Sequence, residues 1–260
     1  MGAIAATGIA LYCPFIPHSL VIPARFIAAF LGAALWGVLS ILPKALWNVN
    51  DTIVTLMMNY VALLFLNWLC YGPWIDHSMN IAVSEPIPDY AMLKTYFGTN
   101  LNICILIAII IAILIYAFFK YTVMGYQIKV ISKNIHAAKY AGMTVAAKIV
   151  LVMLISAGIA GLAGFAQVSG QVHKLQTDFA NGAGFTGIVI AYLSKFNPFI
   201  ILLVSVFFGG LTIGGYSIQM LGVPSQIVTM LQGTILIFVL GGEIFTRYKF
   251  TVIRSAKIKK

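Results

Sequence analysis

The sequence has few charged residues, and fewer of them are acidic than basic. Only 8% of its residues are charged, with six Asp and Glu against sixteen Lys and Arg, and 61% are hydrophobic. Soluble domains carry about 25% charged residues, because their whole surface is in contact with water. The composition excludes an ordinary soluble domain and predicts a chain surrounded mostly by lipid.

Metal and thiol chemistry also have little support in the sequence. The three cysteines are far apart and form no C-x-x-C motif; they are Cys13, Cys70 and Cys104. The four histidines are scattered as well, with no two at helical spacing. We therefore expect the cysteines to be small apolar core residues and expect no metal site in the chain.

Acids are missing from the interior of the apolar runs. Asp51 and Glu243 sit at the expected inner ends of two runs, and Asp178 sits at an outer edge. A carrier driven by protonation keeps such acids inside its spans, so this class is disfavoured. Ser169 and His173 form a loop pair without a G-x-S-x-G motif, which argues against an intramembrane hydrolase. We expect no enzyme activity in this chain.

Long apolar runs are abundant, and a helix needs about 20 such residues to span a bilayer. They predict an all-α, polytopic membrane helix bundle with about eight membrane segments in this chain. Six runs are long enough: 24–42, 52–70, 101–119, 148–168, 198–216 and 226–245. Two more are short, namely 1–16 and the glycine-broken run 184–194.

The distribution of charge predicts which loops face the cytoplasm. Segment 120–148 holds five lysines and no acid, and the tail 246–260 is basic, so both are expected inside. Loop 71–100 holds three acids and one lysine and is expected outside. This alternation works only if 184–194 crosses the membrane. The net charge of +10 then points to lipid headgroups rather than to nucleic acid.

The amino terminus is atypical. The stretch "MGAIAATGIALYCPFIP" has neither a positive region nor a small-residue cleavage site, so it is a poor signal peptide. It is typical of the second part of a membrane segment. We expect a truncated chain or a misplaced start codon.

Glycines at 182, 184 and 187 spell G-x-G-x-x-G, the spacing of a dinucleotide-binding turn. That turn needs a preceding strand and an acid about 20 residues further on. Here a polar stretch precedes it and the next acid is Glu243, so the match is a chance one. Two interpretations remain open: a broken helix that lines a substrate cavity, or a loop leading into a helix with a packing glycine.

Small residues at intervals of four predict close helix contacts in lipid. Run 156–164, "SAGIAGLAG", pairs Ala157 with Gly161 and Ala160 with Gly164, and Gly210 pairs with Gly214 in a later run.

Neutral polar groups inside the spans are candidates for a substrate pathway. Asn59, Asn67 and Gln167 can bond hydroxyl groups and base edges without requiring charge. Phe185 could stack on a nucleobase. The alternatives are interhelical hydrogen bonds for the amides, and a lipid-facing or core position for Phe185.

The basic loop contains a short alanine-rich stretch, Asn134 to Gly142, that ends at a glycine. It predicts a short helix lying on the cytoplasmic face. Such a helix suits docking of a partner protein, and the alternative is a solvated loop that binds lipid headgroups.

The stretch "GYQIKVISKNIHAAKYAGM" at 125–143 resembles the coupling loop of ATP-binding-cassette (ABC) importer permeases, with its N-x-x-A-A-x-x-x-G core. "NVNDTIVTLMMNYVALLFLNWLCYGPW" resembles a segment of the nucleoside branch of the sugar and branched-chain amino acid permease family. "SAGIAGLAG", "GAGFTGIVIAYLSKFNP", "FFGGLTIGG" and "VPSQIVTMLQGTILIFVL" are similar to later blocks of that branch, in the same order. "MGAIAATGIAL" resembles the part after an N-I-G-x-E-G-Q block, which is absent here.

The resemblance implies one integral membrane permease domain over 1–260, with a coupling loop at 120–147 and a basic cytoplasmic tail at 246–260. It implies a multi-pass protein of the bacterial cytoplasmic membrane, with a second permease (a paralogue or a copy), two cassette ATPases and a substrate-binding lipoprotein or periplasmic protein as partners. ATP and Mg²⁺ would bind to the ATPases, leaving no cofactor in this chain. The implied docking residues are Asn134, Ala137, Ala138 and Gly142, with Lys133 and Lys139 as auxiliary charges.

Three functions stay open on the sequence. A nucleoside permease is favoured by the block at 48–74. A permease for ribose-type sugars belongs to the same family. A passive channel or structural membrane subunit is a third class, which a neighbouring gene for a P-loop ATPase would disfavour.

Overall fold

The computed structural model describes residues 1–13, 15, 17–76, 81–93, 95–96, 101–177, 179, 182–219, 224 and 226–247. The chain divides into two compact units, Met1–Asn181 and Gly182–Lys260, and each is described by itself. Of the basic tail expected at 246–260, all but the first two residues lie outside the described residues.

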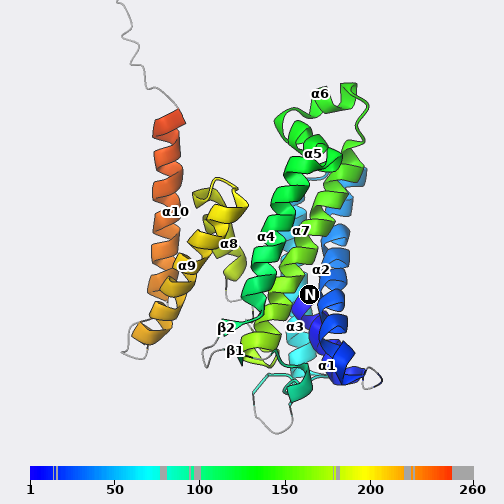
Figure 1. Ribbon diagram of the computed structural model, residues 1–260, viewed down its shortest axis with the longest axis vertical. Helices are drawn as coiled ribbons and strands as arrows, with labels where there is room; N and C mark the ends of the chain where they lie inside the picture. Colours follow the sequence, from blue (N-terminus) through cyan, green and yellow to red (C-terminus); the bar gives the residue numbers. More distant parts are fainter. Residues whose placement is uncertain are drawn as a thin grey trace, which may run out of the picture. The chain divides into compact units, whose positions relative to one another are not determined.

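The first unit consists of long helices with short elements at both ends (Figure 1). Its long helices are α2 (His18–Trp47), α3 (Asp51–Tyr71), α4 (Cys104–Tyr121) and α7 (Val145–Gln167), the last continuing into a π-helical turn, η2 (Val168–Val172). At one end lie α5 (Val123–Lys133) and α6 (Ile135–Tyr140). At the other lie α1 (Gly2–Tyr12), the 3₁₀ turn η1 (Asp89–Ala91) and two antiparallel strands, β1 (Thr95–Tyr96) and β2 (Leu101–Asn102).

The second unit contains α8 (Ala183–Leu193), α9 (Pro198–Gln219) and α10 (Gln226–Arg247). One buried amide joins the three helices. The Thr186 hydroxyl of α8 donates to Gln232 Oε1 of α10 at 2.9 Å. Gln232 Nε2 in turn lies 3.5 Å from the hydroxyl of Thr212 in α9. Such side-chain bonds hold helices together where hydrophobic attraction between them is weak.

Five described helices are long and apolar enough to span a membrane, so the expected count of about eight is not supported. They are Leu20–Trp47, Asp51–Tyr71, Cys104–Tyr121, Val145–Val172 and Pro198–Gln219. Of the other three expected segments, Gly2–Tyr12 and Ala183–Leu193 are shorter helices, and the described apolar part of α10 is Gln226–Val239. An 11-residue helix is about 16 Å long, roughly half the hydrocarbon thickness. The expected alternation of loops therefore has no support from the length of α8.

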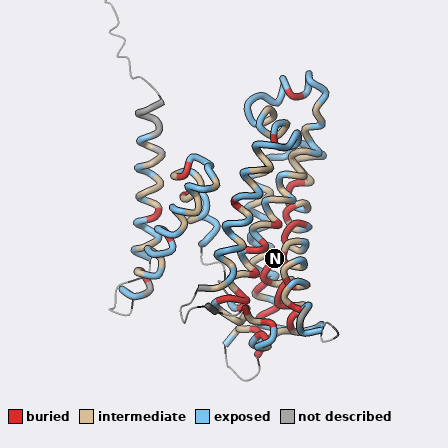
Figure 2. The backbone as a smooth tube through the Cα atoms, viewed as in Figure 1, coloured by how far each residue is buried: buried red, intermediate tan, exposed pale blue. Residues whose placement is uncertain are grey.

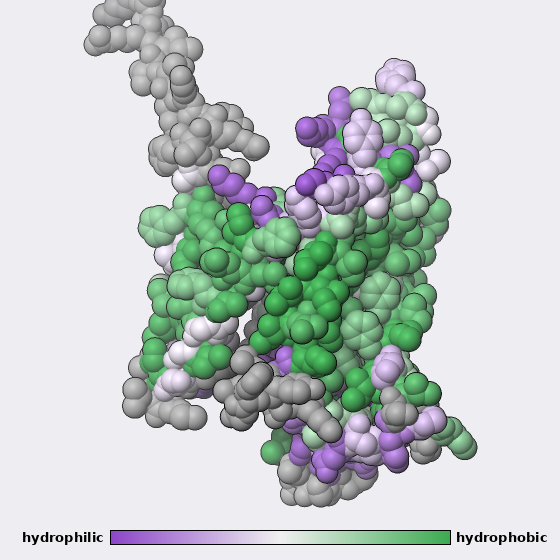
Figure 3. Space-filling model, in the orientation of Figure 1, coloured by the Kyte–Doolittle hydropathy of each residue, from purple (hydrophilic) through white to green (hydrophobic). Residues whose placement is uncertain are grey.

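The surface of the first unit agrees with a membrane environment. Hydrophobic side chains cover the middle of its long helices in Figure 3, and hydrophilic ones gather at the ends. Large apolar side chains of α4, such as Leu106 and Leu114, are more than half exposed. The buried residues of this unit instead concentrate towards the end that carries α1 (Figure 2). The all-helical, multi-pass membrane architecture is confirmed.

Small residues of α7 bring its backbone against α1 and α2, as the sequence predicts. A Cβ placed on Gly161 would lie 2.5 Å from the Cβ of Ala33 and closer still to the carbonyl oxygen of Ala29. On Gly164 it would lie 3.1 Å from the backbone nitrogen of Ala3. Residue 157 meets Gly37 of α2 in the same way. A side chain on Gly161 would overlap the carbonyl oxygen of Ala29, which is a backbone atom and cannot turn aside.

The other glycine motifs behave differently. No described atom lies within 4 Å of a Cβ built on Gly210 or Gly214, so the structure gives no packing contact at this expected motif. Gly182 has φ of 75° and caps the start of α8, where its left-handed backbone favours glycine. This geometry matches a loop leading into a helix.

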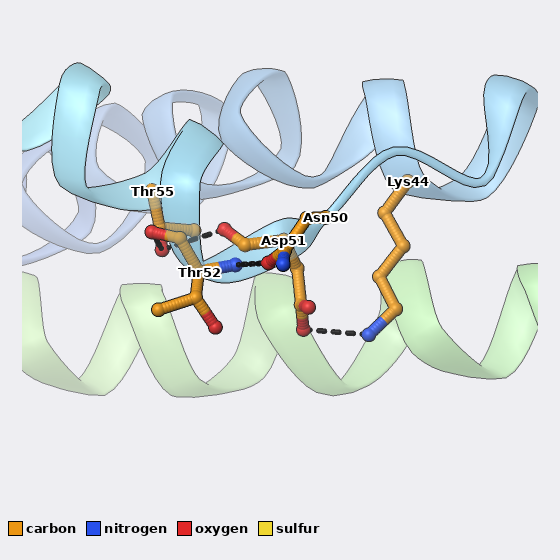
Figure 4. Close-up of polar contacts among 5 residues, drawn as sticks. All are labelled: Lys44, Asn50, Asp51, Thr52 and Thr55. Atoms are coloured by element: carbon orange, nitrogen blue, oxygen red, sulfur yellow. Dashed lines mark hydrogen bonds and ion pairs between the residues drawn. The ribbon is translucent and has the colours of Figure 1, made fainter.

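The turn between α2 and α3 is closed by local polar contacts (Figure 4). Lys44 Nζ lies 2.6 Å from Asp51 Oδ2, which pairs the last turn of α2 with the first turn of α3. Asn48 ends α2 with φ of 55°, and the Asn50 side chain accepts a bond from the Thr52 amide at 3.0 Å. An asparagine suits both places, since it tolerates the left-handed region and caps helices.

We predict that Gly161→Ala destabilises the first unit by about 2 kcal/mol or more, because the new methyl group meets fixed backbone. Thermal unfolding of the purified protein in detergent measures the effect. Gly187→Ala in α8 is the matched control, since no described atom surrounds that glycine, and it should be neutral or slightly stabilising. Equal midpoints for the two variants would refute the seam.

Candidate functional site

The basic loop begins with a tight turn from α4 into α5. The Thr122 hydroxyl donates to the Phe118 carbonyl at 2.6 Å and accepts from the Gly125 amide at 3.0 Å. A Cβ on Gly125 would meet the Phe118 carbonyl oxygen and lie 2.8 Å from Phe119 Cα. Threonine and glycine are therefore both needed for α5 to fold back directly against the end of α4.

Asn134 is the junction between α5 and α6. Its backbone amide donates to the Val130 carbonyl at 3.0 Å and forms the last hydrogen bond of α5. Its side-chain Oδ1 accepts from the amides of His136 and Ala137, at 2.9 and 3.1 Å, and so opens α6. A side-chain cap of this kind satisfies amides that have no partner within the helix. A single asparagine thus fixes the angle between two short helices.

The predicted short helix is present as α6, which ends at Tyr140, and Gly142 lies just past its C-cap, Ala141. The Gly142 φ is 75°, and its amide donates to the Lys139 carbonyl at 3.0 Å. Ala138 is fully buried, and its carbonyl accepts from the Met143 amide at 3.0 Å. Ala138 therefore anchors α6 to its own loop, while the opposite side of the helix is open.

The outward side of this loop carries most of the expected docking residues. Lys133, Asn134, Ala137, Lys139 and Gly142 are all exposed. The sequence reasoning missed the most prominent side chain, Tyr140, which is 94% exposed at the end of α6. An aromatic residue directly after Lys139 in a polar loop was the available signal. The loop offers an exposed aromatic ring directly after Lys139.

The expected pathway residues belong to both units. Asn59 is exposed and Asn67 half-buried, two turns apart on α3. Gln167 is half-buried, and its Nε2 donates to the Phe179 carbonyl at 3.4 Å. Phe185, in the second unit, is 69% exposed. Three of these residues belong to the first unit and the fourth to the second, so each is described only within its own unit.

Two buried polar features were also missed by sequence reasoning. Arg25 is fully buried within α2, although a lone cation in an apolar run was visible in the sequence. Gln232 was visible as a polar residue in an apolar run, but its partners Thr186 and Thr212 were not recognised. Hydroxyls that bond across helices look, in sequence, like those that bond to their own backbone.

The chain belongs to the family described as "Branched-chain amino acid transport system / permease component", which matches residues 1–240. It is therefore a membrane permease subunit of the ABC transporter class, and such subunits are not themselves enzymes. No solved structure matches the chain.

Named relatives of the chain are ABC transporter permeases. It is 31% identical to the guanosine ABC transporter permease protein NupP of Bacillus subtilis, over 86% of this chain and 66% of the relative. It is 27% identical to the nucleoside ABC transporter permease protein NupB of Lactococcus lactis, over 92% and 68%. It is 28% identical to the glucose ABC transporter permease protein TsgB13 of Haloferax volcanii, over 96% and 68%. The chain spans about two thirds of the length of these relatives.

We predict that Asn134→Ala frays α6, because two amides lose their acceptor and a helix cap is worth about 1 kcal/mol. Hydrogen exchange of peptides covering 135–142 should accelerate about fivefold. Asn50→Ala is the matched control, since it removes the cap of α3 and leaves α6 intact. Unchanged exchange at 135–142 in the Asn134 variant would contradict the capping role.

Proposed function

We propose that this chain is the transmembrane permease subunit of an ABC importer that moves nucleosides across the bacterial cytoplasmic membrane. Separate ATPase subunits hydrolyse the ATP, and they dock on α6. The observation that carries the proposal is the capped helix α6 with its exposed Tyr140, in a chain of the permease family. ATP and Mg²⁺ bind to the ATPases in this scheme.

The construction of the loop supports a mechanical role for α6. Thr122 and Gly125 fix α5 against the end of α4, and Asn134 fixes α6 against α5. Residues 141–144 then lead directly into α7. Because both flanking helices are joined to the loop by short turns, a push on α6 is passed to α4 and α7. Movement of docked ATPases would change the packing of the bundle in this way.

Docking is assigned to the exposed side of the loop. Lys133 and Lys139 bring positive charge around Tyr140, which suits an ATPase surface with a pocket for an aromatic ring and acidic residues at its rim. Asn134, Ala137 and Gly142 complete this side. Ala138 contributes from beneath by holding the helix in place.

The nucleoside assignment rests on two of the named relatives, the guanosine permease NupP and the nucleoside permease NupB. Asn59, Asn67 and Gln167 offer neutral amides along the first unit, and Phe185 offers an aromatic face in the second. Amides recognise hydroxyls and base edges, and aromatic rings stack on bases. These residue types are compatible with transport of a neutral solute that carries a base and a sugar.

A ribose-type sugar is the second candidate, and the glucose permease TsgB13 is the observation that favours it. A sugar would use the amides and leave Phe185 without a role as a stacking ring. In both cases a second permease, copy or paralogue, completes the pathway. A lipoprotein or periplasmic protein delivers the solute.

We predict that cells expressing the full-length gene with its ATPase and binding protein take up labelled nucleosides, and that excess ribose does not compete. The host must lack its own nucleoside and ribose importers. A variant of the ATPase P-loop lysine is the control, and it should abolish uptake. Uptake of ribose alone would replace the nucleoside assignment by the sugar one.

A second prediction concerns docking. Tyr140→Ala combined with Lys139→Glu should lower co-purification of the ATPase at least about tenfold, because an anchor side chain contributes about 2 kcal/mol or more. Tyr71→Ala is the control, since Tyr71 is 67% exposed and ends α3, away from the loop. Membrane levels of both variants are measured by quantitative blotting. Normal ATPase recovery with the double variant would overturn docking at α6.

A further inference from the structure

Residues Ser84–Leu93, here called the cap segment, fold over the end of the first unit opposite α6 (Figure 1). Ile87, Ala91 and Leu93 are all more than nine-tenths buried. The segment therefore closes this end of the bundle. The sequence predicts that this end faces outside, because loop 71–100 is rich in acids.

Backbone bonds tie the cap segment to the end of α7 and the residues that follow it. The Leu93 amide donates to the Ser169 carbonyl and the Ile87 amide to the His173 carbonyl, each at 3.0 Å. The Ser84 amide donates to the Leu175 carbonyl at 2.8 Å. These three bonds run along one stretch of chain that starts in the π-helical turn η2.

Arg25 of α2 fastens the same segment from the other side. Its Nη1 donates to the Ala91 carbonyl, and its Nε donates to the Ala6 carbonyl of α1 at 3.0 Å. The guanidinium lies 5.5 Å from the centre of the Phe165 ring of α7. One side chain thus joins the cap segment, α1, α2 and α7. The described residues give this buried cation no carboxylate partner.

Among the residues that the structure describes, several buried polar atoms have no hydrogen-bond partner. In the first unit they are Arg25 Nη2, Asn102 Oδ1, Ser169 Oγ and His173 Nδ1. They belong to one region. Ala91 and Leu93, two residues apart, bond Arg25 and Ser169 respectively, and Asn102 Nδ2 donates to the Gly170 carbonyl at 2.5 Å. A buried polar atom without a partner destabilises the state that buries it, and for a charged group the cost is larger.

We propose that the cap segment is a gate poised to open, with Arg25 as the positioning residue that latches it and Ser169 as a group that opposes closure. Opening brings water to the unsatisfied atoms of Arg25 and Ser169, which offsets the loss of the contacts that hold the segment. The free-energy cost of opening is therefore smaller than it would be if every buried polar atom were bonded. The importance of this gate for import rests on the proposed function, but the gate itself can be tested without any transported solute.

The two side chains have opposite effects on the gate. Arg25→Lys keeps a buried charge but removes the planar group that bridges Ala6 and Ala91, so the closed state loses stability. Ser169→Ala removes an unsatisfied hydroxyl and keeps the backbone carbonyl that holds Leu93, so the closed state gains stability. A side chain with a merely structural role would not produce this second effect, because removing it would weaken closure.

Amide hydrogen exchange of the purified protein in lipid nanodiscs measures the gate directly, because exchange at 84–93 requires the segment to open. We expect exchange of these peptides to rise about tenfold in Arg25→Lys and to fall about tenfold in Ser169→Ala. Ser40→Ala is the matched control. Ser40 is also a buried serine of the first unit, but its hydroxyl is satisfied by the Trp36 carbonyl at 2.8 Å.

Peptides from the middle of α7, residues 150–160, serve as an internal reference and should exchange alike in all variants. Unchanged or faster exchange at 84–93 in Ser169→Ala would show that the hydroxyl is satisfied in the closed state and would overturn the proposal. Unchanged exchange at 84–93 in Arg25→Lys would show that Arg25 does not hold the cap segment closed. If Arg25→Lys does not fold, the Ser169 variant still decides, and uptake assays of nucleosides stay independent of both results.

Discussion

Close approach of the α7 backbone to α1 and α2 is the contact on which the first unit depends. In lipid, apolar side chains gain little by leaving the solvent for each other, so helices are held by tight packing and by polar contacts. Gly161 and Gly164 permit that packing because nothing projects between the backbones. The same helix carries the π-helical turn and the ties of the cap segment at one end, and it follows the loop of α6 at the other. Both features therefore depend on one seam of small residues for their position.

The sequence predicts the class of fold well because the membrane imposes a simple rule on composition. Runs of about 20 apolar residues correspond to the long helices α2, α3, α4, α7 and α9. The seam at Gly161 and the short helix before Gly142 also follow from local patterns. The predicted number of segments is not supported where an apolar run forms a helix shorter than a membrane span. Residues 184–194 are apolar, yet α8 follows the left-handed Gly182 and runs only from Ala183 to Leu193, which is shorter than a spanning helix requires.

Side-chain environments are harder to predict, since they depend on helices distant in sequence. Ala138 looks equivalent to Ala137 in the coupling motif, yet one is fully buried and the other exposed. In the sequence, Arg25 is a single cation interrupting an apolar run. Its contacts with α1, α7 and Ala91 become visible only in the folded structure. Asn59 and Asn67 show a related difficulty. An amide within a span can face a solute, the lipid or a neighbouring helix, and the sequence alone does not distinguish these positions. Tyr140 stands out only once the fold shows that nothing covers it.

The α2–α3 turn bears on how the protein is made. Its contacts, Lys44 with Asp51 and Asn50 with Thr52, link residues close in sequence, so these two helices can pair as a hairpin as soon as both have left the ribosome. The seam with α7 joins residues more than a hundred positions apart. During synthesis the hairpin must therefore wait, with the small-residue face of α2 still open to lipid, until α7 emerges and inserts. Assembly of this unit is a late event in translation, and a stall before α7 would leave a membrane-inserted intermediate exposed to quality-control proteases.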